Sequence, residues 1–185
     1  DSHLSHMLPS AQQFSDYVES LGISKQDKIV VYDGHGLFSA ARVWWMFKLF
    51  GSAEVAILNG GMPAWLAEDH ALEQGVTQPA PGRYAAEPDL KQVATSEYVA
   101  KGLGDEQVQV LDARPAARFT GQEKEARQGL RSGHMPGAHS LPFTYLLDDD
   151  RCLLPIQQLR RLLAPYMGQG EIIASCGSGV TAAVI

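Results

Sequence analysis

The chain has 185 residues, a formal net charge of −6, 45% hydrophobic residues and 19% charged residues, a balance typical of a globular protein with enough apolar material for a core. The acidic charge and the lack of a basic run argue against binding to nucleic acid or to an anionic membrane, and no apolar run approaches the ~20 residues of a membrane span. Two cysteines are too few for a disulfide framework, so we expect a reducing compartment, the cytoplasm.

The first part of the chain predicts an α/β unit. Apolar stretches with strand character alternate with stretches of helical character, and this order favours a mostly parallel sheet flanked by helices. The predicted elements are, in order, a helix opening with "MLPSAQQF" (7–14), the strand "KIVV" (28–31), a glycine turn (33–36), the helix "SAARVWWMFKLFG" (39–51), the strand "EVAILNGG" (54–61) and the helix "MPAWLAED" (62–69).

A second α/β unit follows a stretch rich in proline and glycine, "EQGVTQPAPGRYAAEPDL" (73–90), which is typical of a linker. Its predicted elements are a helix near 96–101, the strand "VQVLDARP" (108–115), a polar loop, the turn "GHMPGA" (133–138), a helix after "LLP" (153–155), the strand "IIA" (172–174), a glycine turn (177–179) and a helix from Val180 onward.

The two units are copies of one repeat. Residues 28–42 match residues 171–185 at a shift of 143, which pairs Asp33 with Cys176 and Gly36 with Gly179. We therefore expect two domains, 1–74 and 93–185, joined by a linker at 75–92. Each copy lacks a part that the other has, so the repeat predicts about 50 further residues before Asp1 and about 40 after Ile185 in the whole protein.

Cys176 lies between an apolar strand and the turn Gly177-Ser178-Gly179. Such a strand-to-helix turn aims successive backbone N–H groups at one point and forms an anion-binding nest. A thiol at its centre is stabilised as the thiolate, and the nest also suits a persulfide anion. A buried structural cysteine is the alternative, but it would not need the glycine turn. Cys152 has no such turn and adjoins an acidic run, so we expect it to be incidental.

Thiolate phosphatases use a similar loop and must be weighed. They need an arginine six positions after the cysteine to bind phosphate oxygens. That position is Ala182, and the loop carries no cationic side chain. The sequence therefore argues against phosphatase activity.

Several segments together resemble the rhodanese-like sulfurtransferases of the tandem-domain type, and within them the branch that uses 3-mercaptopyruvate. The resemblance covers essentially the whole chain, and "CGSGVTA" is its most specific part. Two prolines usual in the family are replaced by Ala41 and Ala126. The segments are "HMLP" (6–9), "LFSAARVWWMF" (37–47), "LDARPAARF" (111–119), "GHMPGA" (133–138) and "CGSGVTA" (176–182).

The resemblance implies that two rhodanese-like domains form the fold and that sulfur travels as a persulfide on Cys176. It implies Ser178 as a second catalytic residue that orients a proton, although a small residue fitting a tight turn is an equal alternative. It implies that Arg118 and, less firmly, Arg127 bind the donor carboxylate, where solvated surface charge is the alternative. The implied substrate loop also includes Gly177, Ser178, Gly179, Val180, Thr181 and Ala182.

The neutral loop favours a donor with one negative charge, 3-mercaptopyruvate, over dianionic thiosulfate, because relatives that use thiosulfate carry an Arg-Lys pair where Gly177 and Ser178 stand. Pyruvate would leave, and a thiol such as thioredoxin, or cyanide, would accept the sulfur.

The first copy has Asp33 in place of the cysteine, so we expect that domain to be inactive. We expect no metal and no cofactor. Thiosulfate specificity and a non-catalytic binding module are the alternative functions.

Overall fold

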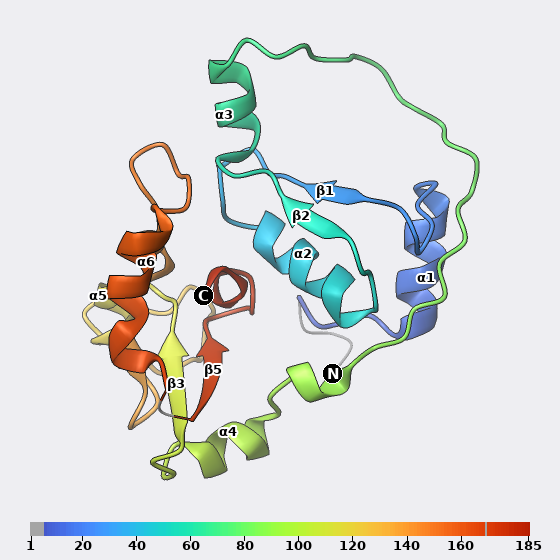
Figure 1. Cartoon of the computed structure of the whole chain (residues 1–185). Helices are drawn as coiled ribbons and strands as arrows, with labels where there is room; N and C mark the ends of the chain where they lie inside the picture. Colours follow the sequence, from blue (N-terminus) through green and yellow to red (C-terminus); the bar gives the residue numbers. More distant parts are fainter. Residues whose placement is uncertain (1–5, 169) are drawn as a thin grey trace. The chain divides into compact units, whose positions relative to one another are not determined.

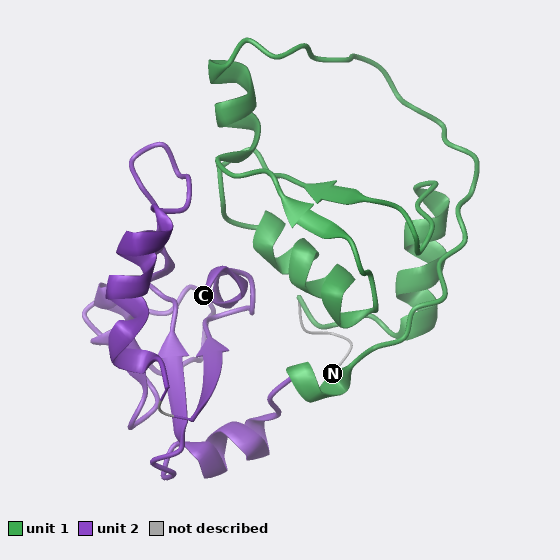
Figure 2. Ribbon diagram, in the orientation of Figure 1, with its two compact units in different colours: residues 1–92 green, residues 93–185 purple. Residues whose placement is uncertain are grey.

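The computed structural model describes residues 6–168 and 170–185, and the chain divides into two compact units, residues 1–92 and 93–185 (Figure 2). Each unit contains its own parallel sheet, with two strands in the first and three in the second. Helices lie beside both sheets (Figure 1). The predicted α/β architecture of parallel sheets flanked by helices is therefore confirmed.

The first unit begins with helix α1, Ala11–Ser20. Ser10 caps this helix, because its hydroxyl accepts the N–H of Gln13 at 3.2 Å while the Gln13 side chain accepts the N–H of Ser10 at 2.9 Å. Strands β1 and β2 pair in parallel, with Val30 opposite Ala56. The remaining elements are β1 (Ile29–Val31), α2 (Ala40–Leu49), β2 (Val55–Ile57), α3 (Gly61–Ala67) and a 3₁₀ helix, η1 (Leu90–Gln92).

An aromatic cluster forms the core of the first unit. The rings of Phe14 and Phe50 stack with centroids 4.2 Å apart, and Tyr84 meets Phe14 edge-on at 5.6 Å. Tyr84 is 1% exposed, and its hydroxyl shares a 2.6 Å hydrogen bond with that of Ser52. The predicted linker, 75–92, therefore includes a segment built into this unit, because an aromatic side chain in a Pro- and Gly-rich stretch fills the core.

The second unit is built on a three-stranded parallel sheet with the order β4-β3-β5. The central strand β3 ends at Asp112 and not at residue 115 as predicted, because Pro115 caps the short helix α5. The elements are α4 (Ser96–Gly102), β3 (Val108–Asp112), α5 (Ala116–Phe119), β4 (His139–Ser140), η2 (Phe143–Leu146), α6 (Ile156–Leu163), η3 (Ala164–Tyr166), β5 (Glu171–Ser175) and η4 (Thr181–Val184).

Burial in the second unit is concentrated on the central strand. Val110 and Leu111 of β3 are at most 1% exposed, and Ile173 of β5 is 6% exposed. Because β3 and β5 run in parallel with Asp112 opposite Ser175, the residues that follow each strand emerge at the same edge of the sheet. That edge is where ligands bind in open α/β sheets.

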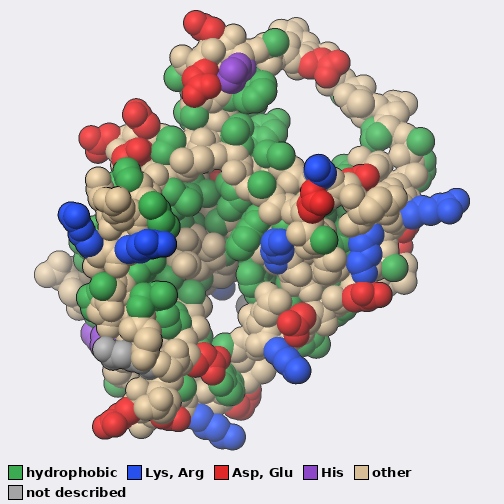
Figure 3. Space-filling view, in the orientation of Figure 1, with side chains coloured by type: hydrophobic (Ala, Val, Ile, Leu, Met, Phe, Trp, Pro, Cys, Tyr) green, Lys and Arg blue, Asp and Glu red, His purple; other side chains and the backbone are tan. Residues whose placement is uncertain are grey.

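Charged side chains of both signs are interspersed on the face drawn in Figure 3.

Helices α1 and α2 have ten residues each, which corresponds to about 15 Å against the ~30 Å of a bilayer core. Within the described parts of the chain, no helix is both long enough and apolar enough to span a membrane.

Candidate active site

Cys176 directly follows β5 at the carboxyl edge of the second sheet. The N–H of Gly179 points at its sulfur, with a nitrogen-to-sulfur distance of 3.0 Å. Gly179 has a φ of 74°, a left-handed conformation that glycine adopts without strain. The glycine turn therefore folds the chain back over the thiol, as the sequence suggested.

The environment of the thiol favours the thiolate. Partial burial by itself would raise the pKa of Cys176, but hydrogen bonds from the Thr181 side chain and from the backbone N–H groups of Ser178, Ala182 and Thr181 outweigh it and lower that pKa. Hydrogen bonds to the charged form are the cause of such a shift. The sulfur thus lies in a nest of neutral donors.

The segment after the nest forms a 3₁₀ helix, η4, where the sequence predicted the start of an α-helix. The N–H of Ala183 bonds to the carbonyl of Val180 at 3.3 Å, and that of Ile185 to Ala182 at 3.3 Å. These i to i−3 bonds define the tighter helix. The first N–H groups of the turn are directed to the sulfur, which leaves the next ones to close the 3₁₀ turns.

Arg118, on α5, lies beside the loop that holds Cys176. A Cβ atom built on Gly177 would be 3.1 Å from Arg118 Nη2 and 4.0 Å from Nη1. The guanidinium therefore packs directly against the residue that follows the cysteine. Arg127 is exposed in the loop after α5, and Ser178 is partly buried within the nest.

Four charged side chains alternate in sign beside this loop. Arg114 pairs with Asp112 at 2.5 Å and with Glu125 at 2.6 Å, and Glu125 also pairs with Arg118. The carboxylate of Glu125 is 6% exposed. Asp112 and Arg114 thus form an ion pair at the end of β3. Glu125 is a site residue that the sequence did not reveal, because nothing in its polar surroundings signals burial.

The first unit repeats the nest around a carboxylate. Asp33 follows β1 and accepts the N–H groups of His35, Phe38 and Ala40 at 2.8, 2.9 and 2.8 Å. Burial would raise the pKa of Asp33, but these hydrogen bonds outweigh it and lower that pKa. At the repeat shift of 143, His35 and Phe38 correspond to Ser178 and Thr181, which serve Cys176.

Cys152 lies in a different environment. Burial and the charges of Asp148 and Asp150 raise the pKa of its thiol.

His134, one of the two histidines around "GHMPGA", stacks on Phe119 with ring centroids 3.7 Å apart and bonds to its carbonyl through Nδ1 at 2.7 Å. Among the described residues, no group of three or more His, Cys, Asp or Glu side chains is arranged to hold a metal ion.

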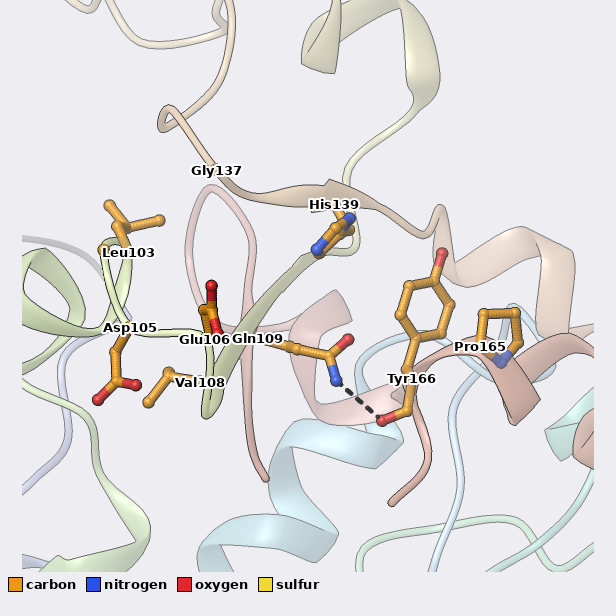
Figure 4. A pocket seen from close by; sticks show the side chains of 10 residues that line it. Leu103, Asp105, Glu106, Val108, Gln109, Gly137, His139, Pro165 and Tyr166 are labelled. Atoms are coloured by element: carbon orange, nitrogen blue, oxygen red, sulfur yellow. Dashed lines mark hydrogen bonds between the residues drawn. The ribbon is translucent and has the colours of Figure 1, made fainter. Parts of the chain in front are cut away.

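A pocket of about 610 Å³ lies at the other edge of the second sheet, near the start of β3. Figure 4 shows His139, Tyr166 and Gln109 around it, and the Gln109 amide donates to the Tyr166 carbonyl at 3.2 Å. Its lining includes Asp105 and Glu106 but no Lys, Arg or Cys. This lining offers neither a cation nor a cysteine, so the Cys176 loop remains the candidate site.

The site belongs to a protein of parallel α/β units, the second of which holds a cysteine sulfur in a nest of backbone N–H groups. The family model of the rhodanese-like domain matches residues 3–68. The crystal structure of SseA from Escherichia coli, described as a 3-mercaptopyruvate sulfotransferase, has a TM-score of 0.87 and 37% identity, and the match covers 98% of this chain and 68% of SseA.

Two curated relatives extend the comparison. The 3-mercaptopyruvate sulfurtransferase of Rattus norvegicus is 40% identical over 181 residues, which cover 96% of this chain and 61% of the relative. The thiosulfate sulfurtransferase of Gallus gallus is 41% identical, with 95% of this chain and 62% of the relative covered. This chain belongs to the rhodanese family, as its motifs predicted, and it spans about three fifths of the length of these curated relatives.

Proposed function

We propose that the protein is a sulfurtransferase that takes sulfane sulfur from 3-mercaptopyruvate through a persulfide on Cys176, releases pyruvate, and passes the sulfur to a thiol such as thioredoxin or to cyanide. The observation that carries the proposal is the Cys176 sulfur, with a lowered pKa, in a neutral nest beside the Arg118 guanidinium. The similarity to the rat and E. coli proteins, whose names include this donor, supports it.

The chemistry follows from the nucleophile. The Cys176 thiolate attacks the sulfur of the donor, the new S–S bond forms, and the donor's C–S bond breaks. The electron pair of that bond remains on carbon, giving the enolate of pyruvate. The proton of the former donor thiol then moves to this carbon, so pyruvate leaves and Cys176 carries a persulfide anion. The nest stabilises that anion as it stabilised the thiolate.

The charge of the site favours a mono-anionic donor. Residues 176–182 supply N–H donors but no cationic side chain, so a dianion would gain little there. Arg118 is the cation beside the loop, and a guanidinium binds a carboxylate in a bidentate manner or reaches a ketone oxygen. We assign Arg118 to the donor carboxylate and Arg127 to a supporting contact.

The other residues of the loop have smaller roles in this proposal. Ser178 and Thr181 offer hydroxyls near the sulfur, and Ser178 orients the proton transfer. Gly177 allows Arg118 to approach the loop closely, and Gly179 allows the backbone to approach the Cys176 sulfur. Val180 and Ala182 shape the wall of the nest.

Thiosulfate is the second candidate donor. The thiosulfate sulfurtransferase of Gallus gallus is as similar to this chain as the rat 3-mercaptopyruvate sulfurtransferase is, at 41% and 40% identity. The absence of a cation in the loop places thiosulfate second, because its two charges would need one.

A single-turnover experiment tests the proposal. The complete protein mixed with 3-mercaptopyruvate should release pyruvate and gain about 32 Da, one sulfur, on Cys176 and not on Cys152. Cys176→Ser should form neither product, because a hydroxyl cannot hold a persulfide. Pyruvate release that persists in Cys176→Ser, or sulfur found on Cys152, would overturn the assignment. The same experiment with thiosulfate in place of 3-mercaptopyruvate tests whether this second candidate also donates its sulfur to Cys176.

A further inference from the structure

Glu125 is buried in a loop that is otherwise open to water. Its side chain is 6% exposed, while the neighbouring Glu123 and Arg127 are exposed. A carboxylate is rarely buried without paired charges. Its position therefore requires a specific set of partners.

Both oxygens of Glu125 are engaged by guanidinium groups. Oε1 accepts from Arg114 Nη1 at 2.6 Å, and Oε2 accepts from Arg118 Nη2. The hydrogen bond from Arg118 is the main cause that lowers the pKa of Glu125, with both arginine charges adding to it against burial. Glu125 thus remains ionised and connects the two arginines.

Arg114 is the fixed end of this arrangement. Its Nε and Nη2 bind the Asp112 carboxylate at 2.5 to 3.0 Å, and Nη2 also donates to the Gly133 carbonyl at 2.9 Å. Asp112 is 2% exposed at the end of the central strand. The position of Arg114, and through it that of Glu125, is therefore set by the sheet.

Arg118 is the dependent end. Its side chain is 22% exposed, and its Nε is buried without a hydrogen-bond partner among the described residues. The hydrogen bond from Nη2 to Glu125 is the contact that holds this guanidinium against Gly177. A long side chain without such a contact would populate several rotamers, and ordering it on donor binding would weaken that binding.

Because Glu125 pairs with both arginines, its single negative charge does not fully offset the positive charge of Arg118. Asp112, Arg114, Glu125 and Arg118 together carry no net charge. Because Arg114 occupies one oxygen of Glu125, Arg118 donates a single hydrogen bond to Glu125 and not a bidentate pair. Arg118 is held in place but keeps donor capacity for an anion at the Cys176 loop.

We infer that Glu125 is a positioning residue, which holds Arg118 beside the Cys176 loop so that its guanidinium meets the carboxylate of the sulfur donor. The inference rests on the proposed function, because it assigns Arg118 to that carboxylate. Glu125 itself does not touch the donor. Its effect must therefore pass through Arg118.

A double-mutant cycle tests this. Glu125→Gln keeps the volume, but its amide can accept from only one of the two arginines. Steady-state pyruvate release from 3-mercaptopyruvate by the complete protein, with a thiol acceptor in excess, should show kcat/KM lowered by about 10-fold or more, mainly through KM, because a misplaced binding group costs this much. In the Arg118→Ala background the same substitution should change kcat/KM by less than about 2-fold.

The control is Glu123→Gln, an exposed carboxylate two residues away, which should leave kcat/KM unchanged in both backgrounds. Glu125→Asp, which retains the charge but shortens the side chain, is taken through the same cycle and decides the question if Glu125→Gln does not fold. Equal losses in both backgrounds, or no loss with native Arg118, would overturn the positioning role while the proposed function stands. A wild-type protein that releases no pyruvate would overturn the proposed function itself.

Discussion

Two added positive charges in the loop should change the preference between donors. Replacing Gly177 with Arg and Ser178 with Lys places cations directly after Cys176, whose loop has none. Each cation about 6 Å from the donor would contribute about 3 kcal/mol per unit of donor charge at an effective dielectric constant of ~20. Thiosulfate carries one unit more than 3-mercaptopyruvate, so it gains more from each cation.

Water reduces this advantage. Gly177 is exposed, and exposed charge pairs retain only about 1 kcal/mol or less. Two such pairs supply at most about 2 kcal/mol, which corresponds to a shift of at most about 30-fold in the ratio of kcat/KM for thiosulfate to kcat/KM for 3-mercaptopyruvate. A side chain at position 177 would also begin 3.1 Å from Arg118 Nη2, which displaces that guanidinium and lowers turnover of the keto acid.

The assay is kcat/KM for both donors in the wild type, in Gly177→Arg/Ser178→Lys, and in a neutral control of similar bulk, Gly177→Gln/Ser178→Gln. The control should lower turnover of 3-mercaptopyruvate through crowding without favouring thiosulfate. A ratio that stays constant in the charged variant, or that shifts equally in the neutral one, would refute loop charge as the determinant of donor choice.

Two further predictions concern the two nests. Because the pKa of Cys176 is lowered and that of Cys152 is raised, iodoacetamide should modify Cys176 at pH values below the ordinary thiol pKa of about 8.5, whereas its reaction with Cys152 should be slow there. Peptide mass spectrometry at several pH values measures both reactions. Because the pKa of Asp33 is lowered in the folded state, its contribution to stability is present above the ordinary Asp pKa of about 3.9 and is lost as the pH falls through the folded value. Asp33→Ala, which removes the acceptor of three backbone N–H groups, should lower the free energy of unfolding at pH 7 by about 1–3 kcal/mol. Urea titrations should show a smaller loss at pH 3 than at pH 7, and equal losses at both pH values would contradict this expectation.

The local sequence determined the elements and the candidate nucleophile. Each predicted strand and helix of residues 6–69 appears within a few residues of its predicted place, because the apolar periodicity and the glycine turns act over short distances. The repeat likewise predicted that Asp33 and Cys176 occupy equivalent turns, and both accept backbone N–H groups there. Cys176 could be identified from its neighbours alone, since the nest is made from the residues that follow it.

Tertiary structure alone decided which distant residues support that nest. Arg118 lies 58 positions before Cys176 in the chain, yet its guanidinium packs against Gly177, because β3 and β5 are adjacent and parallel. Glu125 lies in a polar loop without any periodic signal, and its burial depends on two arginines that the end of β3 brings to it. Tyr84 likewise fills a core from within a proline-rich stretch. Short-range patterns encode strands, turns and a nucleophile, whereas the pairing of buried charges depends on how the strands are ordered in the sheet, which no local pattern specifies.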